Sequence, residues 1–195
     1  MPVSLPSCSL ADLRVIELTA SHEALLQRFF DANPAYFMAV NGEPADPNEA
    51  HKEIHAELPP GWAFTKQWLI GYLGPDNELV AMANITSDLL AQGVWHIGLL
   101  ILATARHGSG QAKTLYQSLE SWAMAHGANW LRLGVVQGNA RAERFWESLG
   151  FVQTRTRSGV IMGQRINTLR VMVKPLRGGS LAHYLALIQR DRPEN

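Results

Sequence analysis

A mixed α/β fold of the α+β type, in which helices cover both faces of a mostly antiparallel sheet, is the fold class that the sequence predicts. The first observation is an apolar strand-like run, Val94–Leu102, which leads through a glycine-bearing turn into a helical pattern. The second is a pair of strand patterns joined by the turn residues 74–77, which favour a hairpin. The third is Trp130–Val136, a run that is apolar apart from Arg132 and is therefore expected to be covered on both faces.

The first elements are one strand and one helix. After an irregular lead-in over residues 1–11, side chains alternate along Leu13–Leu18 as they do in a strand. Ser21 then precedes a helical pattern that is expected to stop at Asn33–Pro34. The apolar side of this helix is formed by Leu25, Leu26, Phe29 and Phe30.

A second helix is expected to start after the loop 41–45. Asp46 stands at the N-cap, Pro47 at the first helical position and Glu49 at the third, which completes a capping box. We expect this helix to end near Leu58, since two prolines and a glycine follow.

Three strands follow in antiparallel order. Gln67–Leu73 and Glu78–Ser87 form the predicted hairpin, and Val94–Leu102 is long enough to pair as the third strand. The next helix is expected over 108–126, with the C-cap glycine Gly127 after it.

The turn between that third strand and that helix is the first feature that indicates chemistry. It consists of His107, Gly108, Ser109, Gly110, Gln111 and Ala112. Amides at a helix start have no intrahelical partner and carry partial positive charge, so small residues here offer a phosphate site. Tight packing explains such turns about as often. A nucleotide P-loop is disfavoured, because His107 and Ala112 stand where that loop needs glycines.

The remaining elements complete one domain, 1–176. Trp130–Val136 is followed by a helix from Asn139 to Gly150 and by strands over 151–157 and 167–174. The tail 177–195 holds a flexible Gly-Gly-Ser joint and a short amphipathic helix. This tail either caps the domain or joins a partner chain, as in a homodimer.

Composition places the chain among ordinary soluble globular proteins, with 47% hydrophobic and 17% charged residues. We expect no signal peptide and no membrane span, because no apolar run approaches ~20 residues. The single cysteine, Cys8, allows no internal disulfide and gives no metal cluster, so we predict a cytoplasmic protein without a metal.

Charge is unevenly distributed. The net charge of zero argues against a general nucleic-acid binder, but residues 1–100 carry −8 and residues 101–195 carry +8. The second half is suited to a polyanion and the first half to a cationic partner. Two oppositely charged, solvated faces explain the same numbers equally well.

Two segments resemble the GNAT superfamily of N-acetyltransferases. The family's first motif is Arg or Gln, two residues, Gly, one residue, and Gly or Ala, and it falls on His107, Gly110 and Ala112. A second family element is met by Asn139, Ala142, Phe145, Trp146, Gly150 and Phe151. The resemblance implies the GNAT fold over 13–176, with a sheet that splays at its central strand.

The resemblance also implies how acetyl-CoA binds. The amides of the turn 107–112 would hold its diphosphate, and the backbone of Leu100 and Leu102 would face its pantetheine and thioester. Asn139 would contact the pantetheine arm. These expectations agree with the free amides of a helix start and with the site at a strand's carboxyl end.

One departure from the family concerns catalysis. Many members carry, at the position of Trp146, a tyrosine that protonates the leaving thiolate, and an indole cannot do so. A thiolate with a pKa near 8.5 can instead be protonated by water or by the proton of the incoming amine. By itself, Trp146 is better explained as a core residue, although its position also places it beside the cofactor.

Two residues are candidates for the general base. His96, in the third strand, and Asp88, after the second, come from adjacent strands that lead toward the splayed edge. The plain alternatives are a core histidine and a turn residue. An amine with a pKa near 10 must lose a proton before it attacks, so one of the two would accept that proton.

The sequence therefore predicts an N-acetyltransferase that moves the acetyl group of acetyl-CoA to a primary amine in a direct ternary complex. The acceptor is expected to be a small cationic amine or a lysine-like side chain, not nucleic acid and not a membrane. The alternatives are a non-catalytic acyl-CoA-binding module that has lost its acid and, less well supported, an ATP-binding P-loop protein.

Overall fold

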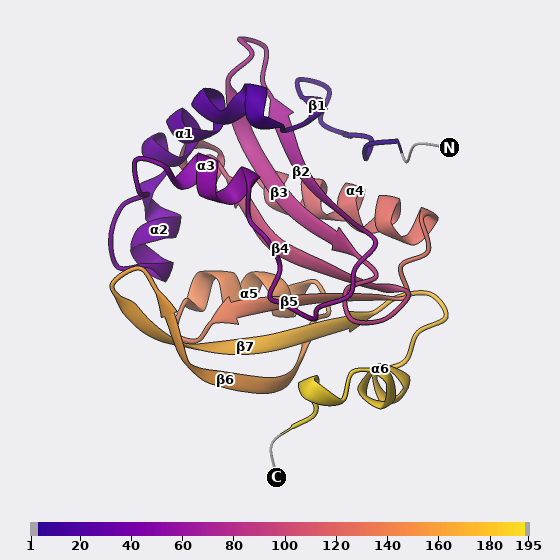
Figure 1. Cartoon of the computed structure of the whole chain (residues 1–195). Coiled ribbons are helices and arrows are strands. Elements are labelled where there is room, and N and C mark those ends of the chain that lie inside the picture. Colours follow the sequence, from indigo (N-terminus) through magenta and orange to yellow (C-terminus); the bar gives the residue numbers. More distant parts are fainter. Residues whose placement is uncertain (1–3, 194–195) are drawn as a thin grey trace.

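Seven strands form one sheet in the computed structural model, which describes residues 4–193 (Figure 1). Their order is β1-β2-β3-β4-β5-β7-β6, and every neighbouring pair is antiparallel except β4 and β5. The predicted mixed, mostly antiparallel sheet is therefore confirmed. The strands are β1 Arg14–Glu17, β2 Lys66–Leu73, β3 Leu79–Ser87, β4 Val94–Leu102, β5 Trp130–Val136, β6 Val152–Met162 and β7 Arg165–Pro175.

Helices cover both faces of this sheet, as predicted. α4 and α5 pack on one face, and α1, α2, α3 and α6 pack on the other (Figure 1). None of the helices within residues 4–193 is long and apolar enough to cross a membrane. The helices are α1 Glu23–Ala32, α2 Pro34–Val40, α3 Glu49–Ile54, α4 Gln111–Ala125, α5 Ala140–Ser148 and α6 Leu181–Leu187.

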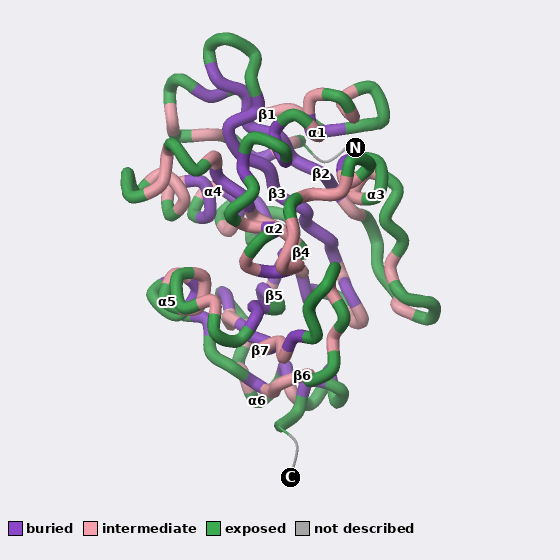
Figure 2. Tube along the Cα trace, turned by 90° about the vertical axis from the view of Figure 1, so that its left-hand side faces the viewer, coloured by how far each residue is buried: buried purple, intermediate pink, exposed green. Residues whose placement is uncertain are grey.

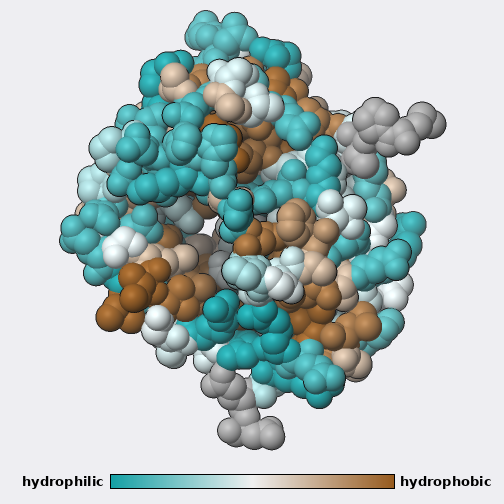
Figure 3. Space-filling model, in the orientation of Figure 1, coloured by the Kyte–Doolittle hydropathy of each residue, from teal (hydrophilic) through white to brown (hydrophobic). Residues whose placement is uncertain are grey.

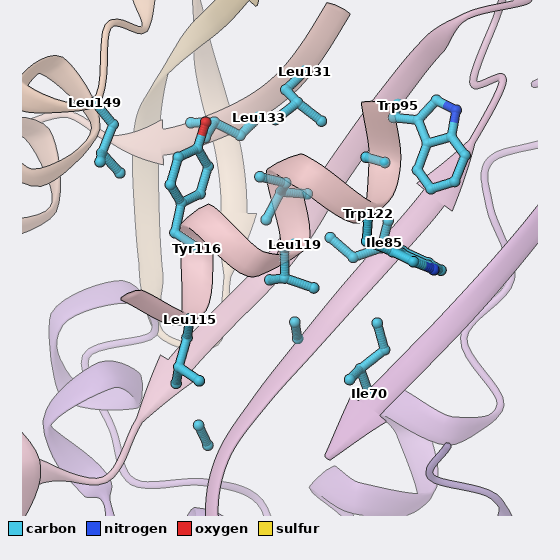
Figure 4. Packing of buried hydrophobic residues seen from close by; sticks show 14 of the residues in the cluster. Ile70, Ile85, Trp95, Leu115, Tyr116, Leu119, Trp122, Leu131, Leu133 and Leu149 are labelled. Atoms are coloured by element: carbon cyan, nitrogen blue, oxygen red, sulfur yellow. The ribbon is translucent and has the colours of Figure 1, made fainter. Parts of the chain in front are cut away.

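The central strands are the best buried part of the chain. All nine residues of β3 are buried, and Figure 2 shows β3 and most of β2 as buried, with exposed loops around them. On the α4 side, Leu115, Leu119 and Trp122 point toward Ile70 and Ile85 of the sheet (Figure 4). This helix is held by apolar burial, which contributes about 1.5–3 kcal/mol per large side chain.

Three tryptophans strengthen the same core. Trp68 and Trp95 stack at 5.5 Å between ring centroids, and Trp122 of α4 meets both rings edge-on at 5.1 and 5.3 Å. Edge-to-face pairs of this kind add about 0.5–1.5 kcal/mol each beyond the burial of area. These contacts hold α4 rigidly on the sheet, and the glycine turn directly precedes this helix.

The sheet opens between β4 and β5, the feature that the site depends on. The two strands pair from Val94 with Trp130 to Ile97 with Leu133, and beyond that point no pairing continues. The register of β4 against β3 shifts at Gly98, since Asn84 faces Leu99 whereas Ile85 faces Ile97. A bulge of this kind bends a strand, so it turns the second half of β4 away from β5.

The structure also contains a helix that the sequence patterns did not predict. We expected the chain to break at Asn33–Pro34, but α2 begins at Pro34 and buries Phe37 and Val40. Proline is tolerated at the first helical position, where its missing N–H has no partner to lose. The predicted helix after Asp46 is shorter than expected and covers only Glu49–Ile54.

β6 and β7 are longer than predicted, and their tip reaches α2. Asn167 Nδ2 donates to the carbonyl of Val40 at 2.9 Å, and the amide of Gln164 donates to the carbonyl of Asn41 at 2.9 Å. Arg165 donates to the carbonyl of Ala39, also at 2.9 Å. The two halves of the sheet are therefore connected across the open side of the splay.

The C-terminal tail forms the predicted amphipathic helix, α6, and it packs on the sheet. Tyr184 and Ile188 are buried against Val94, Trp130 and Val173. The tail helix therefore covers the sheet where β4 and β5 begin and β7 ends. Of the predicted lead-in over residues 1–11, the first three lie outside the described residues, and residues 4–11 form neither helix nor strand.

Candidate active site

A cavity of about 330 Å³ lies where the sheet opens. Its walls come from the second half of β4, the starts of α4 and α5, and α2. In the space-filling view, the surface is hollowed between the helices α1–α3 and the β6–β7 hairpin (Figure 3). The lining residues are Asn33, Ala35, Tyr36, Ala39, Leu100, Ile101, Leu102, Thr104, His107, Ala112, Leu115, Asn139, Arg141, Ala142, Phe145 and Trp146.

The glycine turn lies at one end of this cavity and leaves its amides unpaired. Gly108 and Gly110 have φ values of +79° and +80°, the left-handed region that favours glycine. A Cβ atom at either position would meet no other heavy atom within 4 Å. The two glycines therefore do not serve tight packing. The amides of Gly108, Ser109, Gly110 and Ala112 donate to no acceptor within residues 4–193.

Two side chains stabilise the turn from within. Ser109 Oγ donates to the carbonyl of Arg106 at 2.6 Å and accepts from the amide of Gln111 at 3.4 Å. The side chain of Gln111 accepts from Arg106 at 3.2 Å. This arrangement keeps the remaining amides oriented outward at the start of α4, where the helix dipole adds positive potential.

His107 binds the protein's own backbone. Its Nε2 donates to the carbonyl of Leu102 at 2.8 Å, so that carbonyl is already occupied. The backbone of Leu100 remains available. The amide of Ala103 donates to Val80 of β3, so the alternate residues Leu102 and Leu100 direct their backbone groups to the other side, toward the opening.

Asn139 and Arg141 approach the cavity from α5. Asn139 is the N-cap, and its Oδ1 accepts from the amide of Ala142 at 3.3 Å, which leaves Nδ2 as a free donor on the cavity wall. The exposed guanidinium of Arg141 makes no ion pair with any described residue. Both residues can thus donate to an anionic or amide-containing ligand.

Trp146 is both a core residue and a wall of the cavity. It is 8% exposed, and its ring meets Tyr116, Phe145 and Phe151 edge-on at 5.7, 4.9 and 5.2 Å. The same side chain lines the cavity opposite β4. The core interpretation of this residue therefore holds, and its ring also presents apolar surface to the cavity.

Asp88 does not lie at the splayed edge, which corrects the geometry expected from the sequence. Its carboxylate accepts from the amide of Gly93 at 2.7 Å and from Thr65 Oγ1 at 2.8 Å, and its φ is +53°. It closes the turn before β4, and the sheet opens only after Ile97, toward the other end of the strand. The turn-residue interpretation explains every one of these contacts.

His96 lies nearer to the opening but is held by β5. Its Nδ1 faces the carbonyl of Arg132 at 3.0 Å, and the Arg132 guanidinium lies 3.4 Å from the same nitrogen. Burial, with a smaller contribution from Arg132, lowers the pKa of His96 to about 3. Such a histidine is a weak base at neutral pH, so His96 is not retained as a candidate for the general base.

A different carboxylate lies beside the bulge, and the sequence did not indicate it. Glu53 of α3 accepts from Asn84 Nδ2 at 2.7 Å, and Asn84 in turn accepts from Gln67 at 3.0 Å. Asn84 lies directly over Gly98, because a Cβ placed on that glycine would be 3.4 Å from the Asn84 amide carbon. Burial raises the pKa of Glu53, and the hydrogen bond from Asn84 partly offsets this.

Tyr36 connects this carboxylate to the cavity. The residue lines the cavity, and its hydroxyl donates to no acceptor among the described residues. Burial and the nearby carboxylates of Glu53 and Glu49 raise the pKa of Tyr36. Its hydroxyl is therefore protonated at neutral pH and is available as a hydrogen-bond donor.

Comparison with known proteins identifies the family. The model of the acetyltransferase (GNAT) family matches residues 26–151, which include β2 to β5, the glycine turn and α5. The chain belongs to the GNAT acetyltransferase family. The predicted resemblance is thus confirmed, and no curated protein matches the sequence of this GNAT domain.

Solved structures show the same fold at low sequence identity. An acetyltransferase from Thermus thermophilus has a TM-score of 0.64 and 21% identity, covering 86% of this chain and 99% of that one. A spermidine N-acetyltransferase from Vibrio cholerae, in complex with CoA and spermine, has a TM-score of 0.62 and 16% identity, covering 85% of this chain and 96% of that one. A ribosomal-protein-alanine N-acetyltransferase from Escherichia coli has a TM-score of 0.62 and 14% identity, covering 87% of this chain and 97% of that one. This GNAT domain is thus similar in fold to enzymes with quite different acceptors.

Proposed function

We propose that this protein is an N-acetyltransferase that transfers the acetyl group of acetyl-CoA to a primary amine in a direct ternary complex. One observation carries the proposal. His107 and Ala112, the two ends of the glycine turn, line a single cavity at the splay of β4 and β5 together with Leu100, whose backbone is unpaired there, and the unpaired amides of Gly108, Ser109 and Gly110 lie between those two ends. This arrangement offers anion-binding groups at one end and an exposed strand edge at the other, as an acyl-CoA requires.

The cosubstrate would follow the cavity from end to end. The amides of Gly108 to Ala112 would hold its diphosphate, and Arg141 at the start of α5 adds a cation beside it. Asn139 Nδ2 and the backbone of Leu100 would bind the amides of the pantetheine arm. Trp146 would cover the arm with its ring.

The acceptor would reach the thioester from the α3 side, beside the Gly98 bulge. Attack of the amine nitrogen on the thioester carbonyl forms the C–N bond and, as the C–S bond breaks, releases the thiolate. Glu53, directly or through water, would accept the proton that the ammonium must lose. Glu53 then releases this proton to solvent. The nitrogen loses a second proton as the amide forms, and that proton passes to the thiolate, while the Tyr36 hydroxyl donates a hydrogen bond to the sulfur or to the carbonyl oxygen.

The acceptor class follows from the charges on that side. Glu53 and Glu49 of α3 act on the Tyr36 end of the cavity and attract an ammonium group. A small primary amine, or the side chain of a lysine-like residue, therefore suits this end better than an anionic substrate. The similar structures include one named for spermidine and one named for an alanine of a ribosomal protein, so the same fold occurs with a small-molecule acceptor and with a protein acceptor.

A non-catalytic acyl-CoA-binding module is the second candidate, and Trp146 favours it. The indole at this position can neither protonate the thiolate nor donate to it from a hydroxyl. The module would bind acetyl-CoA but would show no amine-dependent release of free thiol. Thiol release measured with a panel of cationic, neutral and anionic amines distinguishes the two candidates.

The cofactor site itself can be tested at Gly110. We expect calorimetry to show micromolar CoA binding, about −8 kcal/mol, and Gly110→Glu to abolish it, because a carboxylate would occupy the phosphate position. Gly127→Glu is the matched control. Gly127 has a φ of +97°, also has open surroundings, and lies after the other end of the same helix. Equal affinity in both variants would disprove the assignment of the turn.

A further inference from the structure

Two histidines and a glutamate converge on the outer surface of α1 and α3. His51 and His55 are one helical turn apart on α3 and its C-cap, with ring centroids 4.4 Å apart. Glu23, in the first turn of α1, places its Oε2 2.9 Å from His51 Nδ1. One ligand atom from each residue lies within 4.8 Å of the other two. Within residues 4–193 this is the single group of its kind.

The backbone that carries these side chains is fixed by hydrogen bonds between the two helices. Gln27, one turn after Glu23 on α1, accepts from the amide of Ala50 at 2.9 Å and donates to the carbonyl of Asp46 at 2.9 Å. Ala50 is the neighbour of His51 and is fully buried. The ligand positions on α1 and α3 are therefore set by the packing of the helices and not by the exposed side chains themselves.

We propose that Glu23, His51 and His55 form a binding site for a divalent transition metal, best suited to Zn²⁺. Two imidazole nitrogens and one carboxylate oxygen are a ligand set that Zn²⁺ accepts, with a fourth position left for water. Zinc needs ligand bonds of about 2.0–2.2 Å, so the three atoms must move somewhat closer together than 4.8 Å. His51 and Glu23 are 56% and 43% exposed, so small side-chain rotations suffice.

The bound ion replaces the hydrogen bond between His51 and Glu23 and fastens α3 to α1. Mg²⁺ is excluded on chemical grounds, since it prefers an all-oxygen octahedral shell. The single cysteine predicts that the protein has no metal. That argument does not consider two histidines at i and i+4, His51 and His55, whose site is completed by Glu23 of another helix. The site lies on the opposite side of α3 from the contact between Glu53 and Asn84, and its existence does not depend on acetyl transfer.

Calorimetry with ZnCl₂ on the full chain, freed of any affinity tag and dialysed against a chelator, tests the site. We expect one Zn²⁺ per chain with a dissociation constant in the micromolar range, and no heat with MgCl₂. Loss of one ligand should weaken binding by at least the ~10–100-fold that outer-shell losses cost, so His51→Gln, His55→Gln and Glu23→Gln should all show it. His126→Gln removes an exposed histidine at the end of α4 and should leave the affinity unchanged.

A second readout reports the ligands directly. Co²⁺ added in place of Zn²⁺ should give visible absorption bands of a site of low coordination number in wild type, and those bands should be lost in the His51→Gln/His55→Gln double variant. The melting temperature without metal checks that each exposed substitution leaves the fold intact. The proposal is overturned if Zn²⁺ binds more weakly than about 100 μM, or if the double variant binds it as tightly as wild type.

Discussion

The carboxylate of Glu53 is the single group whose replacement most directly tests the chemistry. Glu53→Gln keeps an oxygen that can accept from Asn84 and removes the ability to take up a proton. If Glu53 is the general base, turnover falls by about 10²-fold or more while CoA binding is retained. The wild-type rate should rise with pH as Glu53 ionises, at a pH above the ordinary glutamate value of about 4.3, because burial raises its pKa. The variant should lack this limb.

Glu49→Gln is the control for that experiment. Glu49 lies one turn earlier on the same helix and also acts on Tyr36, but it makes no hydrogen bond to Asn84. We expect it to weaken the binding of a cationic amine and to keep the pH limb, moved to a somewhat lower pH because the charge of Glu49 helps to raise the pKa of Glu53. An unaltered pH profile in Glu53→Gln would remove Glu53 from the mechanism.

The residues of the candidate site differ in how far the sequence could predict them. The turn 107–112, Leu100, Asn139 and Trp146 belong to contiguous motifs, and the two ends of the turn, His107 and Ala112, line one cavity together with the other three residues. Glu53 and Tyr36 carry no such signal, because α2 and α3 place them by packing against strands far away in the sequence. Asp88 and His96 are candidates only because they come from adjacent strands, and the direction of those strands does not tell at which end a sheet opens.

At the scale of elements, the largest difference from expectation comes from one proline. The pair Asn33–Pro34 predicts a break in the chain, although proline at a first helical position is as compatible with a helix start. The helix that the sequence does not predict is α2, which carries Tyr36, a residue that lines the cavity. The bulge at Gly98 could not be predicted from the sequence either. An isolated glycine in a strand indicates a bulge only when the register of that strand against its neighbour, here β3, is known.

The C-terminal tail offers a prediction about stability. The carboxylate of Asp191, 1% exposed, accepts from Arg132 Nε and Nη2 at 2.6 and 3.0 Å, and it also accepts from the Tyr184 hydroxyl. Although burial opposes it, Arg132 lowers the pKa of Asp191. Asp191→Asn leaves a buried guanidinium without its counterion, which costs about 3–5 kcal/mol. Urea unfolding at pH 7 should show this as a lower midpoint.

A surface pair on the same protein provides the comparison. Asp12 accepts from Arg106 at 2.9 Å, and its side chain is 47% exposed. Asp12→Asn should cost at most about 1 kcal/mol, because solvent screens exposed ion pairs. If both variants lose the same small amount, the tail contributes little to the folded state through Asp191.

At the scale of the whole molecule, the two charged halves of the sequence form two sides of one site. The acidic half contributes α1–α3 and the carboxylate of Glu53, and the basic half contributes α5 and Arg141 beside the glycine turn. The halves meet at the splay between β4 and β5. We infer that the opposite charges separate an anionic cosubstrate from a cationic acceptor along a single cavity, which a purely solvated surface would not require.

Acid sensitivity of the whole fold provides the last prediction, and His96 determines its sign. In the folded state the pKa of His96 is lowered to about 3, whereas an unfolded histidine titrates near 6.5. Below pH 6.5 the unfolded chain therefore binds a proton that the folded chain does not. The free energy of unfolding falls by about 1.4 kcal/mol per pH unit, or about 2 kcal/mol between pH 7 and pH 5.

His96→Asn removes that proton uptake and can still donate to the Arg132 carbonyl. Whatever the difference in the free energy of unfolding between the variant and wild type at pH 7, it should change by about 2 kcal/mol in favour of the variant by pH 5. Urea unfolding at pH 7, 6 and 5 measures this, with His126→Asn, an exposed histidine, expected to run parallel to wild type. Parallel curves for His96→Asn and wild type would mean that His96 accepts a proton in the folded protein, and it would then have to be reconsidered as the base.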